Sequence, residues 1–287
     1  MTGPLVPRIL ARVSVAIAAL GIALVGYVYL ASERELRRKY DVNLTDIDVT
    51  TDSASIREGR RLAAIRGCPG CHGAQLEGAV FYEDFLEGRY VAPNLTRVAS
   101  EYTAPELARA IRHGVRANGE GLWAMPSPMF YHLSDRDVGL IIAYLRAAPS
   151  VEGGYDYEFR PGPLVRWGLL TGEWWAIPND VAQLGSRLGA PAPTDTIPFG
   201  QYLAKTSCTE CHGNDLAGQD ATPDLTIVAA YTFDDFSRLM GTGRALGDRE
   251  LPMMSGVARS RFSHFTPREL AALYAFLQAR ARGSGPS

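Results

Sequence analysis

Two pentapeptides decide how this sequence can fold: Cys68-Pro69-Gly70-Cys71-His72 and Cys208-Thr209-Glu210-Cys211-His212. They contain all four cysteines of the 287-residue chain. The C-x-x-C-H pattern is typical of covalent haem attachment, because two thiols one short turn apart can reach both vinyl groups of one porphyrin. The imidazole that follows can then ligate the iron. A thioredoxin-like redox pair, a disulfide and a zinc site are the competing interpretations. Two haem c groups are favoured because the pattern occurs twice and leaves no cysteine over.

The residues around the two pentapeptides also repeat. His72-Gly73-Ala74-Gln75-Leu76-Glu77-Gly78 matches His212-Gly213-Asn214-Asp215-Leu216-Ala217-Gly218 at an offset of 140. Further matches pair Gly59-x-x-Leu62-Ala63 with Gly200-x-x-Leu203-Ala204, Ala92-Pro93-Asn94-Leu95-Thr96 with Thr222-Pro223-Asp224-Leu225-Thr226, and Phe130-Tyr131-His132-Leu133-Ser134 with Phe262-Ser263-His264-Phe265-Thr266. These anchor points follow one order, which indicates two copies of one domain.

Helix signals predict an all-α fold for both copies. Thr103-x-x-Glu106 and Ser134-x-x-Asp137 have the form of helix N-caps in the first copy, and Thr232-x-x-Asp235 and Thr266-Pro267-x-Glu269 have it in the second. We therefore expect three or four helices in each of two domains, at 55–150 and 196–283. The Pro- and Trp-rich linker, 151–195, is expected to pack across both domains as an irregular strap that shields haem edges or fills the core. The Asp-rich spacer, 32–54, is expected to be solvated.

The N-terminal segment, 1–31, contains an apolar run. Nineteen residues from Val13 to Ala31 carry no charge, which is about the length that spans a bilayer's hydrocarbon core. This run predicts one transmembrane helix over 13–31. A cleaved signal peptide is the alternative, because Arg8 and Arg12 precede the run, although it lacks a small-x-small cleavage site. Four basic residues follow the span and two precede it. This count of positive charges alone would place the residues after the span in the cytoplasm.

The sixth iron ligand has several candidates. Met125-Pro126 ends a Gly-rich loop from which a thioether can reach a haem face, so Met125 is preferred over Met129, which adjoins Phe130. In the second copy Met254 is preferred over its neighbour Met253. Other candidates are Met240, His113 and the equivalently placed His132 and His264, which would give bis-His ligation.

Pro93 and Pro223 follow their pentapeptides at similar positions. A carbonyl that accepts the Nδ1–H of the proximal histidine would fix its tautomer and strengthen it as a ligand. We expect these two prolines to supply that carbonyl. Each proline could instead simply set a turn.

Taken together, these motifs resemble class I cytochrome c domains in tandem. The resemblance rests on both C-x-x-C-H-G runs, on Pro93-Asn94-Leu95, and on Met125-Pro126 followed by Phe130-x-x-Leu133-Ser134-Asp135 and Ala143-Tyr144-Leu145. More narrowly, the chain is similar to membrane-anchored dihaem c-type cytochromes of bacteria. The resemblance implies an all-helical fold around each haem, with the proline carbonyls on the proximal histidines and methionine as sixth ligand. It also implies haem attachment outside the cytoplasmic membrane, and so a single-pass protein whose haem domains face the periplasm.

This resemblance predicts electron transfer in a respiratory or photosynthetic chain. Donor and acceptor would be drawn from a dehydrogenase, a quinol-oxidising complex, an oxidase or a soluble cytochrome, and the chain could be a subunit of a larger membrane complex. A dihaem cytochrome c peroxidase is the alternative, since it also has two such motifs. It would need an open iron position and a nearby acid or base. Candidates for that acid or base are Glu101, Glu120 and Glu250, and no sequence feature distinguishes any of them. The formal charge of -2 argues against a nucleic-acid partner.

Overall fold

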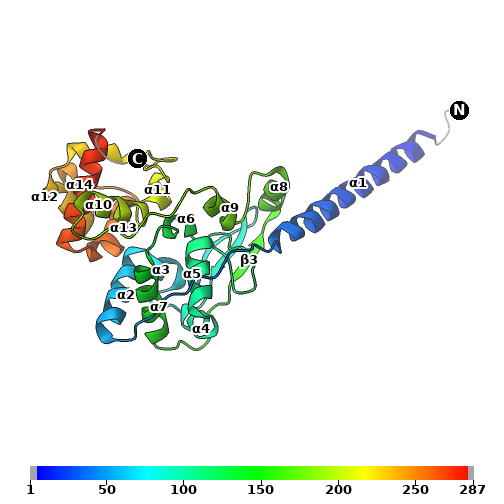
Figure 1. Cartoon of the computed structure of the whole chain (residues 1–287). Coiled ribbons are helices and arrows are strands. Elements are labelled where there is room, and N and C mark those ends of the chain that lie inside the picture. The colour runs from blue at the N-terminus through cyan, green and yellow to red at the C-terminus, as the bar shows by residue number, and fades with distance from the viewer. Residues whose placement is uncertain (1–4, 284–287) are drawn as a thin grey trace.

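The computed structural model describes residues 5–283. Helix α1, Leu5–Leu36, extends away from a body formed by the rest of the chain (Figure 1). From Arg8 to Leu36 this helix is long and apolar enough to cross a membrane, and its large hydrophobic side chains are exposed. A signal sequence would meet the same criterion. The helix is longer than the predicted 13–31 because its charged flanks are helical too.

The first haem-motif domain is built from helices, two of which begin where the caps were predicted, at Thr103 and Ser134. Its helices are α2 (Ser53–Ile65), α3 (Cys68–His72), α4 (Leu95–Glu101), α5 (Ala104–His113), α6 (Ser127–Phe130) and α7 (Asp135–Ala147). Thr103 and Glu106 form a complete capping box on α5, and the Ser134 side chain caps α7 by accepting from the Asp137 N–H.

The second domain repeats this order. Its helices are α10 (Thr196–Lys205), α11 (Thr209–His212), α12 (Phe233–Thr242), α13 (Met254–Ser260) and α14 (Pro267–Ala281), with short 3₁₀ turns η1 (Leu225–Ala230), η2 (Leu246–Asp248) and η3 (Phe262–His264). Strands β4 (Arg244–Ala245) and β5 (Arg249–Glu250) pair in the loop before α13. Thr266 and Glu269 form a capping box on α14. The helix-rich fold expected from the sequence is confirmed.

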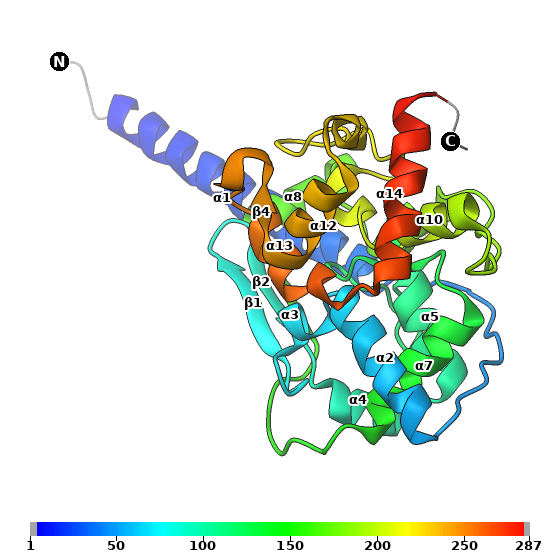
Figure 2. The same cartoon turned by 90° about the vertical axis from the view of Figure 1, so that its left-hand side faces the viewer.

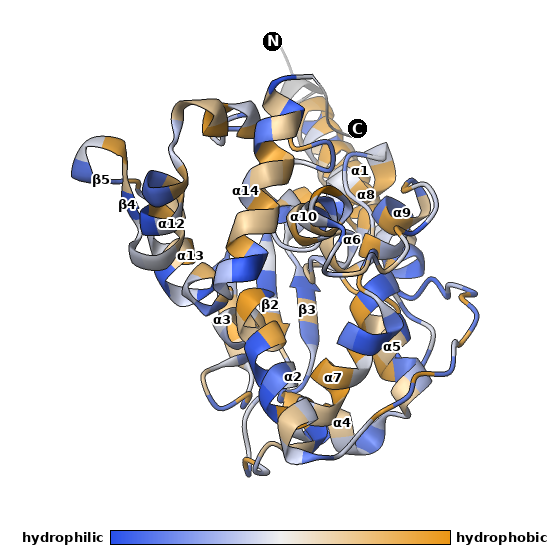
Figure 3. Ribbon diagram, turned by 60° about the vertical axis from the view of Figure 1, so that its left-hand side comes forward, coloured by the Kyte–Doolittle hydropathy of each residue, from blue (hydrophilic) through white to orange (hydrophobic). Residues whose placement is uncertain are grey.

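In both domains the first and last helices cross at a glycine. A Cβ placed on Gly59 of α2 would lie 1.9 Å from the Leu140 carbonyl oxygen of α7. A Cβ on Gly200 of α10 would lie 2.1 Å from the Ala272 oxygen of α14. These glycines let the two backbones approach far closer than any side chain permits, and apolar residues on either side close the core. Figure 3 shows how much of α7 and α14 is hydrophobic.

The two copies also share details of backbone conformation, but the first copy contains an insertion that the second lacks. Leu76 and Leu216 are separated by the offset of 140, and both have positive φ. The Leu76 carbonyl accepts a hydrogen bond from the Leu95 N–H, and the Leu216 carbonyl accepts one from the Leu225 N–H. The two donors, Leu95 and Leu225, are separated by only 130 positions. The first copy therefore holds ten extra residues, and they lie in the hairpin of β1 (Ala79–Asp84) and β2 (Gly88–Ala92). The sequence analysis missed this hairpin.

The linker is more ordered than expected. Strand β3 (Glu158–Pro161) pairs with β2 to complete a three-stranded antiparallel sheet. Helix α8 (Pro163–Thr171) packs against α1, and α9 (Ile177–Ala182) packs against α5 and α6. The expectation of an irregular strap is therefore wrong. The aromatic side chains explain the order, because Trp123 stacks on Phe159 of β3 and Tyr90 packs against the same ring at a tilt.

The spacer after α1 also differs from the expected solvated segment. It has little regular structure, but the Tyr40 N–H donates to the Gly119 carbonyl and the Ile47 side chain is buried in the core of the first domain. The aspartates of this segment face solvent, as expected: Asp41, Asp46 and Asp48 are exposed. Ile47 and Val49 pack against the core, and Gly139 of α7 leaves room for the Asp48 carbonyl, so this segment lies close to α7.

The two domains share one continuous hydrophobic core and lie against each other, with α13 towards α3 (Figures 1 and 2). Arg61 of α2 donates two hydrogen bonds to the Glu269 carboxylate of α14, at 2.7 and 2.9 Å. The Tyr202 hydroxyl donates to Asp137 at 2.6 Å and accepts from the Ser134 N–H. These polar contacts fix how the domains face each other.

Candidate haem sites

The first pentapeptide forms the short helix α3. Gly67 precedes it in the left-handed conformation, φ 76°, which turns the chain out of α2 so that Cys68 and Cys71 lie on one side. The His72 Nδ1 atom lies 2.8 Å from the Pro93 carbonyl oxygen, and the Gly78 N–H donates to the His72 carbonyl. With Nδ1–H donating to that carbonyl, Nε2 keeps its lone pair for a metal.

The second pentapeptide reproduces this geometry. The His212 Nδ1 atom lies 2.8 Å from the Pro223 carbonyl oxygen, and the Gly218 N–H donates to the His212 carbonyl. The structure thus brings each predicted proline carbonyl to its histidine.

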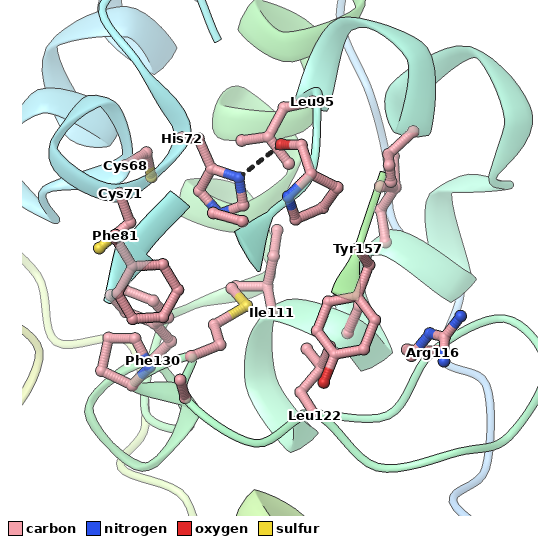
Figure 4. Close-up of a pocket in the computed structure, with 18 of the residues that line it drawn as sticks. Cys68, Cys71, His72, Phe81, Leu95, Ile111, Arg116, Leu122, Phe130 and Tyr157 are labelled. Atoms are coloured by element: carbon pink, nitrogen blue, oxygen red, sulfur yellow. Dashed lines mark hydrogen bonds between the residues drawn. The ribbon is translucent and has the colours of Figure 1, made fainter. Parts of the chain in front are cut away.

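A cavity of about 360 Å³ opens beside the first pentapeptide, within the usual size range of small-molecule sites. Cys68, Cys71 and His72 lie together at one side of it, and Phe81, Ile111 and Phe130 border it (Figure 4). Met125 also lines this cavity. The structure therefore brings together the two thiols, the proximal histidine and the preferred methionine around an apolar space.

The end of the cavity away from the cysteines is polar. Tyr157 and Arg116 lie there, across from Cys68, Cys71 and His72 (Figure 4), and the Arg116 guanidinium stacks 4.6 Å from the centre of the Tyr157 ring. The Tyr157 hydroxyl is buried without a hydrogen-bond partner, and burial raises its pKa. A haem has an apolar body and two carboxylates, so an apolar cavity with an orphaned hydroxyl and a cation at its far end fits it.

The alternatives for the cysteines fit less well. All four are free, and burial raises the pKa of Cys68 to about 11 and that of Cys208 to about 12. A thioredoxin-like pair needs a lowered thiol pKa, so this is the opposite electrostatic setting. Within residues 5–283, no three His, Cys, Asp or Glu side chains gather as a metal site would require, which argues against a shared zinc site.

The remaining ligand candidates in the first domain lie away from the cavity. Met129 is 2% exposed in the core and does not line the cavity of His72. His132 Nδ1 accepts from the Leu188 N–H, and the His113 ring packs edge-on against Tyr131. Each therefore has a structural role that accounts for it.

In the second domain Met254 is partly buried against the core, whereas Met253 is 65% exposed. Met240 is buried in the core, and the His264 side chain is exposed. Met254 is thus the one of these three methionines that is neither enclosed in the core nor largely exposed.

Three charged residues at the domain interface were missed by the sequence analysis. Arg66 is 2% exposed, donates to Thr206 Oγ1 at 3.0 Å, and leaves its Nε and Nη1 groups without hydrogen-bond partners. Arg261 of the second domain pairs with Glu210 at 2.6 Å and reaches into the space beside Gly67, where a Cβ would lie 2.4 Å from its guanidinium. Arg66, Arg261 and Glu210 all line the first cavity, although Glu210 belongs to the second pentapeptide. No local pattern marks this contact, because it exists only once the domains dock.

The fold and the site define a tandem protein of c-type haem domains. Comparison with known families gives the same answer: the cytochrome c family matches residues 56–149 and 199–281, and the chain belongs to that family. Cytochrome c domains carry covalently bound haem c with its iron and transfer electrons.

Three relatives are cytochrome subunits of dehydrogenases. The gluconate 2-dehydrogenase cytochrome c subunit of Pantoea cypripedii is 30% identical over 58% of this chain and 39% of its own length. The fructose dehydrogenase cytochrome subunit of Gluconobacter japonicus is 24% identical over 78% of this chain and 52% of its own length. The alcohol dehydrogenase (quinone) cytochrome c subunit of Gluconacetobacter polyoxogenes is 31% identical over 56% of this chain and 36% of its own length. The chain thus matches about half or less of the length of each. All three are named as cytochrome subunits, in keeping with the expectation of an electron carrier.

Proposed function

We propose that this chain is a membrane-anchored dihaem cytochrome that takes single electrons from a dehydrogenase and passes them to a membrane or periplasmic acceptor. The observation that carries the proposal is the cavity that joins Cys68, Cys71, His72 and Met125, together with the repeat of the same attachment geometry at His212. Bound haem would supply a one-electron iron couple, whose potential a thioether ligand raises.

The chain's own residues have distinct roles in this proposal. Cys68, Cys71, Cys208 and Cys211 hold the two haems covalently, and His72 and His212 ligate iron through Nε2. The carbonyls of Pro93 and Pro223 keep both imidazoles in the required tautomer. Met125 and Met254 would supply the sixth ligands, with Met129 and Met253 as the alternatives that burial and exposure disfavour.

The domain interface is the proposed route between the haems. Glu210, inside the second pentapeptide, borders the first cavity, and its partner Arg261 reaches the chain beside Cys68. Glu210 offsets the charge of Arg261, so the net positive charge at this junction comes from Arg66, and it would favour the reduced state of an iron on either side. Electrons would therefore cross at the contact between the two attachment motifs.

A dehydrogenase is the proposed donor because the relatives are subunits of dehydrogenases. A quinol-oxidising complex is the alternative donor, and an oxidase or a soluble cytochrome is the proposed acceptor. We place the haem domains in the periplasm, with α1 retained in the inner membrane, because its exposed apolar side chains need a lipid environment. Subunit membership in a larger complex is the related hypothesis.

The peroxidase alternative needs an acid or base and an open iron position. Glu101 borders the first cavity, but Met125 also lines it. Glu120 is paired with Arg116 and Lys39, and Glu250 with Arg259 and Arg244. The carrier is therefore the function that the geometry supports better.

Single substitutions of the methionines test the proposal. In Met125→Ala and Met254→Ala we expect loss of the spectral signature of methionine–iron ligation at one haem and a fall in that haem's midpoint potential. Met129→Ala and Met253→Ala are the matched controls and should leave ligation unchanged. Retention of methionine ligation at both haems in Met125→Ala would contradict the proposed ligand set, and a naturally high-spin haem in the unmodified protein would favour the peroxidase.

A further inference from the structure

Helix α8 of the linker is attached to the base of α1 (Figure 1). The Arg166 guanidinium donates to Ser32 Oγ at 2.8 Å, lies 3.5 Å from the Glu33 carboxylate and stacks 4.4 Å from the centre of the Tyr29 ring. These contacts hold α8 level with the last turn of the apolar run. The buried Ser32 side chain shows that this junction is closely packed.

A group of exposed apolar side chains gathers around α8. Leu164 and Trp167 lie one turn apart on the same face of the helix. The chain after α8 turns back so that the Trp174 N–H donates to the Gly168 carbonyl and its indole packs against the Gly168 backbone. At the other end, the Leu86 carbonyl accepts from the Leu164 N–H, which joins the turn of the β1–β2 hairpin to the group. We name Phe85, Leu86, Leu164, Trp167 and Trp174 the juxtamembrane patch.

The exposure of this patch is unusual for a protein surface. Phe85 is 84% exposed and Trp167 is 50% exposed. Isolated surface apolar residues need no explanation, but a contiguous group of aromatic and leucine side chains marks an interaction surface. The hairpin that contributes Phe85 and Leu86 contains the ten-residue insertion that the second domain lacks.

The position of the patch indicates that lipid contacts it. Tyr29 and Ser32 bracket the end of the apolar run, and with a rise of about 1.5 Å per residue they lie within about 5 Å of the edge of the hydrocarbon region. Helix α8, bound to these residues, therefore lies at the depth of the lipid headgroups. Tryptophan and other amphipathic aromatic residues are enriched at that depth because the ring is apolar and the N–H can remain hydrated.

We infer that the juxtamembrane patch inserts into the headgroup region of the bilayer that α1 spans, so that the first haem domain rests on the membrane surface. This inference rests on the proposed function, since it requires α1 to be a retained anchor. The packed spacer, with Tyr40 bonded to Gly119, removes the free tether that would let the domain swing away. The orientation of both domains relative to the membrane is then fixed by the fold.

Photo-crosslinking to lipid tests the inference. The full haem-loaded chain is placed in phosphatidylcholine nanodiscs that contain a lipid with a diazirine near its headgroup, and the labelled peptides are identified by mass spectrometry. We expect label on α1, on the 85–86 turn and on α8. Ile227 and Phe233, which are exposed apolar residues of the second domain, should stay unlabelled.

A double variant provides the matched comparison. Leu164→Glu with Trp167→Glu should lower the label on the 85–86 turn by about tenfold while the label on α1 is unchanged, because two apolar contacts with lipid are replaced by charges. Ile227→Glu should change neither. Label confined to α1 in the unmodified protein would overturn the inference and leave the patch to a protein partner. Absence of label on α1 itself would instead refute the proposed membrane anchor.

Discussion

Replacement of Gly200 by alanine sets two physical effects against each other. Alanine has the higher helix propensity, and in an open helical position the exchange would stabilise the protein by about 1 kcal/mol. In α10, however, the new Cβ would lie 2.1 Å from the Ala272 carbonyl oxygen and 2.7 Å from its carbon. An ordinary contact is more than an ångström longer, and a backbone carbonyl cannot rotate away, so α10 and α14 must separate. Overpacking of this kind costs about 3 kcal/mol, which gives a net loss of about 2 kcal/mol for Gly200→Ala.

Gly256 is the matched control because it lies in the same domain, in α13, with no atom within 4 Å of its Cβ position. Gly256→Ala should therefore be neutral or stabilising, by up to about 1 kcal/mol. Urea unfolding of both haem-loaded variants, followed by circular dichroism and by the haem spectrum, gives the two free energies of unfolding. A Gly200→Ala variant as stable as Gly256→Ala would refute the helix crossing described for this domain.

Three further predictions concern polar contacts. Arg61→Met should lower the free energy of unfolding by about 2 kcal/mol, because it leaves Glu269 without its ion-pair partner at the domain interface. The hydrogen bond from Arg61 also lowers the pKa of Glu58, so the part of the stabilisation that comes from the Arg61–Glu58 pair is present at neutral pH and is lost as the pH falls through that lowered pKa; a flat acid limb in unfolding scans of the unmodified protein would contradict it. Tyr157→Phe should destabilise the haem-loaded protein by about 1 kcal/mol if the hydroxyl binds a haem carboxylate, whereas a more stable variant in thermal unfolding would show that the hydroxyl has no partner. Arg66→Gln should lower both midpoint potentials in a spectroelectrochemical titration, by roughly 50 mV at an iron about 15 Å from the charge for an effective dielectric constant of about 20. Unchanged potentials would remove Arg66 from the inter-haem region.

The parts of the fold that the sequence predicted are those written in local patterns. The caps at Thr103, Ser134 and Thr266 act on residues three positions away, so their hydrogen bonds could be foreseen. The duplication placed Pro93 and Pro223 in equivalent positions, and both carbonyls lie 2.8 Å from their histidines. Local chemistry and a repeated spacing were sufficient there.

The parts that could not be predicted depend on contacts between distant segments. Strand β3 forms because it pairs with the edge of β2 and because Phe159 packs against Tyr90, and the linker sequence reveals neither contact. The same strand brings Tyr157 to the cavity, so the polar end of the site was invisible beforehand. Arg261 and Glu210 belong to one domain, and only the docking of the two domains places them at the cavity of the other.

An optical redox titration of the purified, membrane-extracted protein tests the central claim most directly. The account predicts two one-electron transitions, both at high potential, with spectral signs of methionine ligation in each and a haem content of two per chain. One transition at low potential with a high-spin spectrum, or a single haem per chain, would contradict the account of a dihaem electron carrier.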